Sequence, residues 1–129
     1  MHALAQPALT ANAAIGTALN ILNKWDCTEK EKMAILGIGR STLHKYQVSA
    51  DGARLTPDLL ERISYLLNIH ALLRTIFENP DNIYGFVRMP NRSAFFGGKA
   101  PMDIMSSGLM TALYEVYKHL DAIRSGEFA

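Results

Sequence analysis

Apolar residues recur at the three- and four-residue spacing of an amphipathic helix along most of the chain. The first such stripe comprises Ile15, Ala18, Leu19, Leu22 and Trp25, and it predicts a helix from about residue 10 to residue 25. No segment has a convincing strand pattern, and no repeat is evident. Helices are therefore predicted at about 10–25, 28–36, 40–47, 56–77, 82–88, 101–106 and 109–124, which together describe an all-α protein.

Local start and stop signals support these boundaries. Thr28 and Glu31 form a Thr-x-x-Glu capping box, and Gly37 ends the helix that follows. Thr56 and Pro57 open the clearest helix of the chain. Its predicted buried face consists of Leu59, Leu60, Ile63, Leu66, Leu67, His70, Leu73 and Phe77, and that of the last helix consists of Leu109, Leu113, Val116, Leu120 and Ile123.

Residues 28–47 have the pattern of a helix-turn-helix, with two short helices joined by a tight turn at Gly37. The second helix carries the mixture of cations and hydroxyls that contacts phosphates and base edges in a major groove. The candidate DNA-binding residues are Arg40, Ser41, Thr42, His44 and Lys45. An ordinary helical hairpin with solvated charges has the same spacing, so the pattern alone leaves both interpretations open.

The chain as a whole is no polycation, because its formal net charge is +1. Any DNA contact would come from a local patch, and a single copy would bind weakly, which favours a dimer. The 129 residues are 49% hydrophobic and 19% charged, as in an ordinary globular protein. One cysteine and no apolar run of membrane-spanning length suggest a soluble protein of the reducing cytoplasm.

The segment Gly97-Gly98-Lys99 resembles a phosphate-binding loop at first sight. A P-loop requires a serine or threonine after the lysine, a preceding strand and a long following helix, whereas Ala100 follows Lys99 here. The glycines are better explained as a turn with positive φ that leads into a helix started by Pro101. An enzyme built on this loop is therefore disfavoured, and no catalytic residues, metal site or cofactor are predicted.

The side chains that most often carry chemistry have structural explanations instead. The four histidines lack metal-ligand spacing, and His70 is expected to be a hydrogen-bonded residue of the core. Cys27 lies beside Asp26 and Glu29, whose charges would raise the pKa of its thiol, so a structural role is expected.

Four segments carry a resemblance to a known family. They read "EKMAILGIGRSTLHKY", "LLNIHALLRTIF", "FVRMPNRSAFFGGKAPMDIMSSG" and "LYEVYKHLDAIRSG". Together they resemble the Xre/MbcA/ParS-type antitoxins, and among these the chain is most similar to the Xre antitoxins paired with RES-domain toxins. The resemblance extends from about Leu9 to the end, and it departs at Phe86, where the family often has a tryptophan.

The resemblance implies two regions, an Xre-like helix-turn-helix bundle over 1–55 packed with a helical toxin-binding region over 56–129. It implies an antitoxin that forms a homodimer, binds its own promoter and neutralises a RES-type toxin that consumes NAD⁺ by occluding the toxin's active site. The alternative is a plain helix-turn-helix regulator without a toxin partner. By position, the toxin-facing candidates are Gly97, Gly98, Lys99, Pro101, Arg124, Gly126, Glu127 and Phe128.

Overall fold

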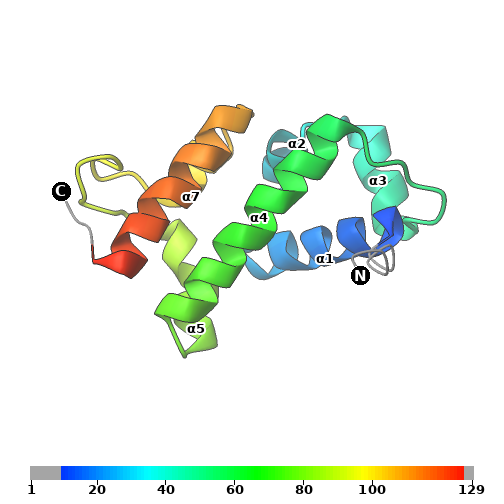
Figure 1. The fold of residues 1–129 in the computed structure, drawn as a ribbon. Coiled ribbons are helices and arrows are strands. Elements are labelled where there is room, and N and C mark those ends of the chain that lie inside the picture. The colour runs from blue at the N-terminus through cyan, green and yellow to red at the C-terminus, as the bar shows by residue number, and fades with distance from the viewer. Residues whose placement is uncertain (1–9, 127–129) are drawn as a thin grey trace.

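The computed structural model describes residues 10–126, and this part of the chain is helical without any strand (Figure 1). The prediction of an all-α protein is therefore confirmed. In chain order the elements are α1 (Ala11–Lys24), α2 (Glu29–Leu36), α3 (Arg40–Val48), α4 (Pro57–Ile76), α5 (Pro80–Gly85), the 3₁₀ helix η2 (Phe86–Arg88), α6 (Pro101–Met105) and α7 (Met110–Ser125).

Side-chain caps start the helices where the sequence predicts them. The Thr28 hydroxyl accepts a hydrogen bond from the Glu31 amide at 3.1 Å, and the Glu31 carboxylate accepts one from the Thr28 amide at 2.9 Å. Thr10 and Thr56 cap α1 and α4 through the same kind of bond. Each cap satisfies an amide that the first helical turn leaves without a partner, which explains why short threonine signals locate these helices well.

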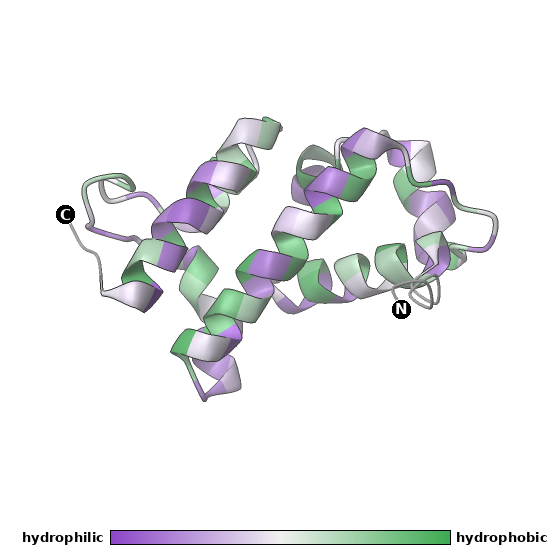
Figure 2. Ribbon diagram, viewed as in Figure 1, coloured by the Kyte–Doolittle hydropathy of each residue, from purple (hydrophilic) through white to green (hydrophobic). Residues whose placement is uncertain are grey.

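The long helix α4 is the centre of the molecule (Figure 1). Helix α7 lies along one side of it, and α1, α2 and α3 gather on the other side. Figure 2 shows hydrophobic and hydrophilic stretches alternating along α4 and α7, as expected for helices that bury one face. The buried side chains form one continuous core that includes Trp25 at the C-cap of α1, Leu43 from α3 and Phe96 from the segment before α6.

Two residues predicted to be buried are exposed. Leu60 is 48% exposed and Leu109 is 62% exposed. Leu60 lies next to Leu59, which faces the core, and one residue of α-helix turns the side chain by about 100°. Leu109 is the N-cap of α7 in an extended conformation, so it lies outside the stripe that continues from Leu113.

Arg62 occupies the buried face of α4 that apolar residues were expected to fill, and it is only 9% exposed. Its guanidinium donates to the carbonyls of Ala34 at 3.2 Å and Ile35 at 3.4 Å in α2, and to the carbonyl of Gly108 at 3.1 Å before α7. Its Nε also donates to Asp58 at 2.9 Å. A single side chain of α4 therefore joins the N-terminal helices to the segment that precedes α7.

Candidate functional site

The turn between α2 and α3 has the tight geometry predicted for a helix-turn-helix. Gly37 ends α2 with φ +66° and donates to the Met33 carbonyl at 2.8 Å. A Cβ atom at this position would lie 2.7 Å from Nε of Arg62, so both backbone conformation and space require glycine. Leu43 buries the inner face of α3. The outer face of α3 is turned to solvent, as the predicted recognition helix requires.

Four of the five candidate DNA-binding residues are exposed, namely Arg40, Ser41, His44 and Lys45, and Thr42 is half-buried. Two of them are already paired with an acidic side chain. Glu29, the first residue of α2, accepts a hydrogen bond from Arg40 Nη1 at 2.6 Å with one oxygen and contacts His44 Nε2 with the other. The hydrogen bond with His44 is the main reason that the pKa of Glu29 is lowered. The charge presented by α3 is therefore smaller than its sequence indicates.

The glycine loop before α6 is held together by its own backbone. Gly98 donates to the Asn91 carbonyl at 2.8 Å and Asn91 donates to the Lys99 carbonyl at 3.0 Å, which closes the base of the loop. Gly97 and Gly98 have φ +58° and +92°, so the predicted positive-φ turn is confirmed. Lys99 is exposed, whereas Pro101 is buried at the start of α6. Pro101 therefore shapes the loop rather than presenting a side chain at its surface.

Two aromatic residues attach this loop to α7. Phe96 is buried in the core, and Phe95 stacks on His119 of α7 with ring centroids 3.9 Å apart and ring planes 8° apart. His119 also lies 3.4 Å from Glu115 on the preceding turn. The sequence prediction gave no role to His119 or Phe95. Their stack nevertheless brings the loop at 97–99 and the C-terminal half of α7 into one surface.

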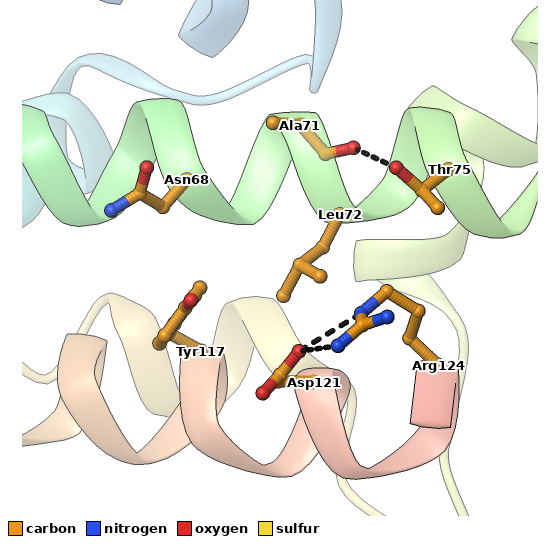
Figure 3. A pocket seen from close by; sticks show the side chains of 7 residues that line it. All are labelled: Asn68, Ala71, Leu72, Thr75, Tyr117, Asp121 and Arg124. Atoms are coloured by element: carbon orange, nitrogen blue, oxygen red, sulfur yellow. Dashed lines mark hydrogen bonds and ion pairs between the residues drawn. The ribbon is translucent and has the colours of Figure 1, made fainter. Parts of the chain in front are cut away.

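Beside the end of α7 lies a shallow groove of about 350 Å³ between α4 and α7 (Figure 3). We call it the α4–α7 groove. Arg124 lies at one end of it and is paired with Asp121 at 2.8 Å. Gly126, the C-cap of α7, has φ +81°. Of the other toxin-facing candidates, Glu127 and Phe128 lie outside the described residues. The groove is lined by Asn68, Ala71, Leu72, Thr75, Tyr117, Asp121 and Arg124.

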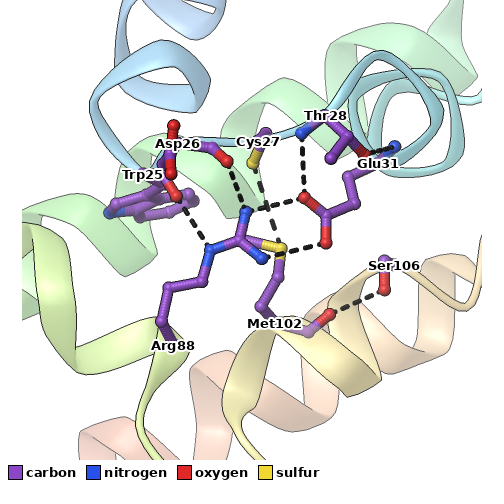
Figure 4. Close-up of polar contacts among 8 residues, drawn as sticks. All are labelled: Trp25, Asp26, Cys27, Thr28, Glu31, Arg88, Met102 and Ser106. Atoms are coloured by element: carbon purple, nitrogen blue, oxygen red, sulfur yellow. Dashed lines mark hydrogen bonds and ion pairs between the residues drawn. The ribbon is translucent and has the colours of Figure 1, made fainter.

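A second arginine, Arg88, links the two halves of the chain at the point where α1 ends and α2 begins (Figure 4). Arg88 in η2 donates to the carbonyls of Trp25 at 3.0 Å and Asp26 at 2.8 Å, and it forms a two-pronged ion pair with Glu31 at 2.6 and 3.0 Å. This ion pair lowers the pKa of Glu31 and raises that of Arg88. Because Glu31 also belongs to the capping box, the start of α2 is tied to the C-terminal half.

Cys27 lies beside this ion pair, with Sγ 4.0 Å from Sδ of Met102. Burial raises the pKa of its thiol to about 12. The predicted direction is confirmed, but burial is the main cause and not the charges of Asp26 and Glu29. A thiol in this state is a poor nucleophile at neutral pH, which fits a structural role.

Within residues 10–126, no three His, Cys, Asp or Glu side chains are arranged to hold a metal ion. No helix in the same range is long and apolar enough to cross a membrane.

Comparison with known proteins gives two family matches that together span most of the chain. Residues 4–68 match the model described as the antitoxin Xre-like helix-turn-helix domain, and residues 72–126 match the antitoxin Xre/MbcA/ParS C-terminal toxin-binding domain. A curated relative, "Uncharacterized protein y4oB" of Sinorhizobium fredii (strain NBRC 101917 / NGR234), is 34% identical over 107 residues, which cover 82% of this chain and 80% of that protein. The two matches meet inside α4, between residues 68 and 72, whereas the sequence suggested a division at 55/56.

Proposed function

Because the chain belongs to the family of Xre-like antitoxins with an Xre/MbcA/ParS C-terminal toxin-binding domain, we propose that it is the antitoxin of a type II toxin–antitoxin pair whose toxin is of the RES type and degrades NAD⁺. In this proposal the C-terminal half occludes the toxin's active site. The α2–α3 unit binds the operon's own promoter as part of a homodimer. In this proposal the chain acts by binding its partners and not by catalysis, which the descriptions of the two matched domains support.

One observation carries the proposal: α4 packs against the N-terminal helices on one side and against α7 on the other, and the exposed loop at 97–99 is fixed on α7. The loop is closed by its own hydrogen bonds and stacked on His119, so it needs little further ordering when it meets a partner. A pre-ordered surface loses less conformational entropy on binding than a flexible one. This favours a docking surface around Gly97, Gly98 and Lys99.

Charge gives this surface its expected specificity. Lys99 is exposed on the loop, and Arg124 stands at the end of the α4–α7 groove. We expect these cations to pair with acidic groups at the rim of the toxin's cleft, while the groove and the end of α7 exclude water and substrate. Arg124 must exchange its present partner Asp121 for a group of the toxin, or bind through both.

The toxin-neutralising part of the proposal, here called the toxin arm, is tested by expressing the neighbouring gene with and without this chain. A neighbouring RES-type toxin is expected to copurify with the chain and to lower cellular NAD⁺ when expressed alone. Coexpression of the full chain should restore NAD⁺. Removal of 124–129, or Lys99→Ala combined with Arg124→Ala, should weaken this rescue. Arg54→Ala removes an exposed cation from the loop after α3 and serves as the matched control, which should protect fully.

The result that would contradict the toxin arm is equal protection by the truncated and the complete chain. Copurification without any RES-type partner would favour the alternative, a plain helix-turn-helix regulator.

The DNA-binding part of the proposal, here called the DNA arm, has a separate test. Arg40→Ala combined with Lys45→Ala should lower affinity for the upstream duplex and flatten its dependence on salt, because each lost phosphate contact removes about 0.9 from the slope of log K against log salt. An unchanged slope would show that these residues do not touch phosphate.

A further inference from the structure

We propose that Glu29 is a negative determinant of DNA binding, a carboxylate that engages Arg40 and His44 of the recognition helix and so limits how tightly the chain holds DNA. This inference rests on the proposed DNA-binding role of α2–α3 and adds a residue to it that opposes that role.

The geometry places one carboxylate between two of the candidate DNA-binding residues of α3. Arg40 and His44 are four residues apart, so they lie on the same face of α3, and that face is turned toward the first residue of α2. Each of the two Glu29 oxygens serves one of them. The side chains of Arg40, His44 and Glu29 are 68%, 53% and 37% exposed, so the cluster lies at the surface where DNA would approach.

Electrostatics make this arrangement unfavourable for DNA. The N-termini of α2 and α3 are the places where a helix-turn-helix offers amides and cations to phosphate groups. Glu29 puts a negative charge at the first of these ends and neutralises the nearest cation at the second. Of the charged candidates on α3, Lys45 is the one for which the described part of the chain shows no ion pair. A phosphate that approaches Arg40 therefore meets the negative charge of Glu29 and competes with it for the guanidinium.

Stability does not account for the cluster. An ion pair between groups this exposed contributes little to folding, because water screens the charges and both side chains lose freedom in forming it. The capping box and the Arg88 contact at Glu31 already hold the start of α2 in place. Replacing Glu29 is therefore expected to leave the fold intact, and its effect should be seen in the affinity for DNA.

The test is Glu29→Gln in the full chain, which keeps the side chain's size and removes its charge. Binding to the duplex upstream of the gene, and to an unrelated duplex, is followed by fluorescence anisotropy from about 50 to 200 mM salt. The variant should bind about fivefold to tenfold more tightly at about 0.1 M salt, with a salt slope steeper by about one, as expected for one more phosphate contact. The unrelated duplex should show the same gain, since phosphate contacts do not read sequence.

A matched control separates local from overall charge. Glu78→Gln removes the same charge from an exposed position after the far end of α4, and it should leave the affinity nearly unchanged. A double-mutant cycle adds the partner: Arg40→Ala should cost more affinity in the Glu29→Gln background than in the native chain, because there Arg40 binds phosphate without competition from Glu29.

The outcomes distinguish the inference from the function on which it rests. Equal affinity and slope for the native chain and Glu29→Gln, or an equal gain from Glu78→Gln, would overturn the inference and leave DNA binding in place. Failure of both Glu29→Gln and the native chain to bind at low salt would overturn the inference together with the DNA arm, while toxin neutralisation would still be open to test.

Discussion

Replacing Arg62 by methionine is expected to destabilise the fold by about 3 kcal/mol. Methionine keeps most of the apolar stem but has no donors for the carbonyls of Ala34 and Gly108, which lie 3.2 and 3.1 Å from the guanidinium. Hydrogen bonds to a charged group contribute about 1.5–3 kcal/mol each, and the lower value for these two gives the total. The contact with Ile35 is longer, at 3.4 Å, and is left out of the sum.

The assay is unfolding in urea and by heat, followed by far-UV circular dichroism. The unfolding entropy is about 2.1 cal/mol/K per residue, and the chain has 129 residues. Dividing the expected loss of about 3 kcal/mol by the unfolding entropy of the whole chain gives a fall in Tm of about 11 °C. Asp58→Ala is the control, because Asp58 bonds the same arginine but its side chain is 59% exposed. A loss below about 1 kcal/mol for Arg62→Met, or an equal loss for Asp58→Ala, would refute the reasoning.

A double-mutant cycle with Gly37 tests the contact itself. Alanine at this position brings a Cβ atom 2.7 Å from Arg62 Nε and also strains the backbone at φ +66°. The flexible methionine side chain of Arg62→Met can move away from the added Cβ atom and so relieve the steric clash. The cost of the strained backbone at position 37, about 1 kcal/mol, remains with either residue at position 62. The double variant should therefore be less destabilised than the sum of the two single variants.

Two further predictions concern the contacts around Arg88. The pKa of Glu31 in the folded chain lies below its ordinary value, so the stabilisation from its ionised form is fully present above the ordinary glutamate pKa of about 4.3 and is lost as the pH falls through the lower folded value. The urea midpoint of the native chain should thus fall more steeply with acid than that of Glu31→Gln, and parallel curves would contradict this contribution. The Cys27 thiol, with a pKa raised to about 12 by burial, should react with a thiol reagent at about pH 8 far more slowly in the folded chain than in urea. Equal rates in the two conditions would show that the thiol is not protected.

The elements with local signals were those that the sequence predicted well. Thr10, Thr28 and Thr56 cap helices through bonds to residues three positions ahead, so the whole interaction is contained in a short segment. The turn at Gly97 and Gly98 is local in the same sense. Helical periodicity also gave the buried face of α4 approximately, but it counted Leu60 as buried and omitted Arg62, because hydropathy alone does not register a long charged side chain whose partners lie elsewhere.

Contacts between distant segments could not be predicted from the sequence. The pairing of Glu29 with Arg40 and His44 depends on the angle between two helices, and the stack of Phe95 on His119 joins residues 24 positions apart. Spacing shows which residues share a helix face, but not which face meets which. The candidate surfaces could therefore be named by residue type, while the charge on the recognition helix could be assessed only from the structure.

The position of α4 limits how the chain can be divided into fragments or recombined into hybrids. The two family matches meet within it, yet its side chains serve both: Arg62 reaches carbonyls on α2 and before α7, and Leu66 and Leu73 belong to the common core. A hybrid that joins the N-terminal half of this chain to the C-terminal half of a relative near residue 70 would preserve the helix but pack it against side chains from two different proteins. Fragments for studying either half separately should keep α4 entire. The unit that can be transferred to another protein with its packing intact is therefore the two matched regions together.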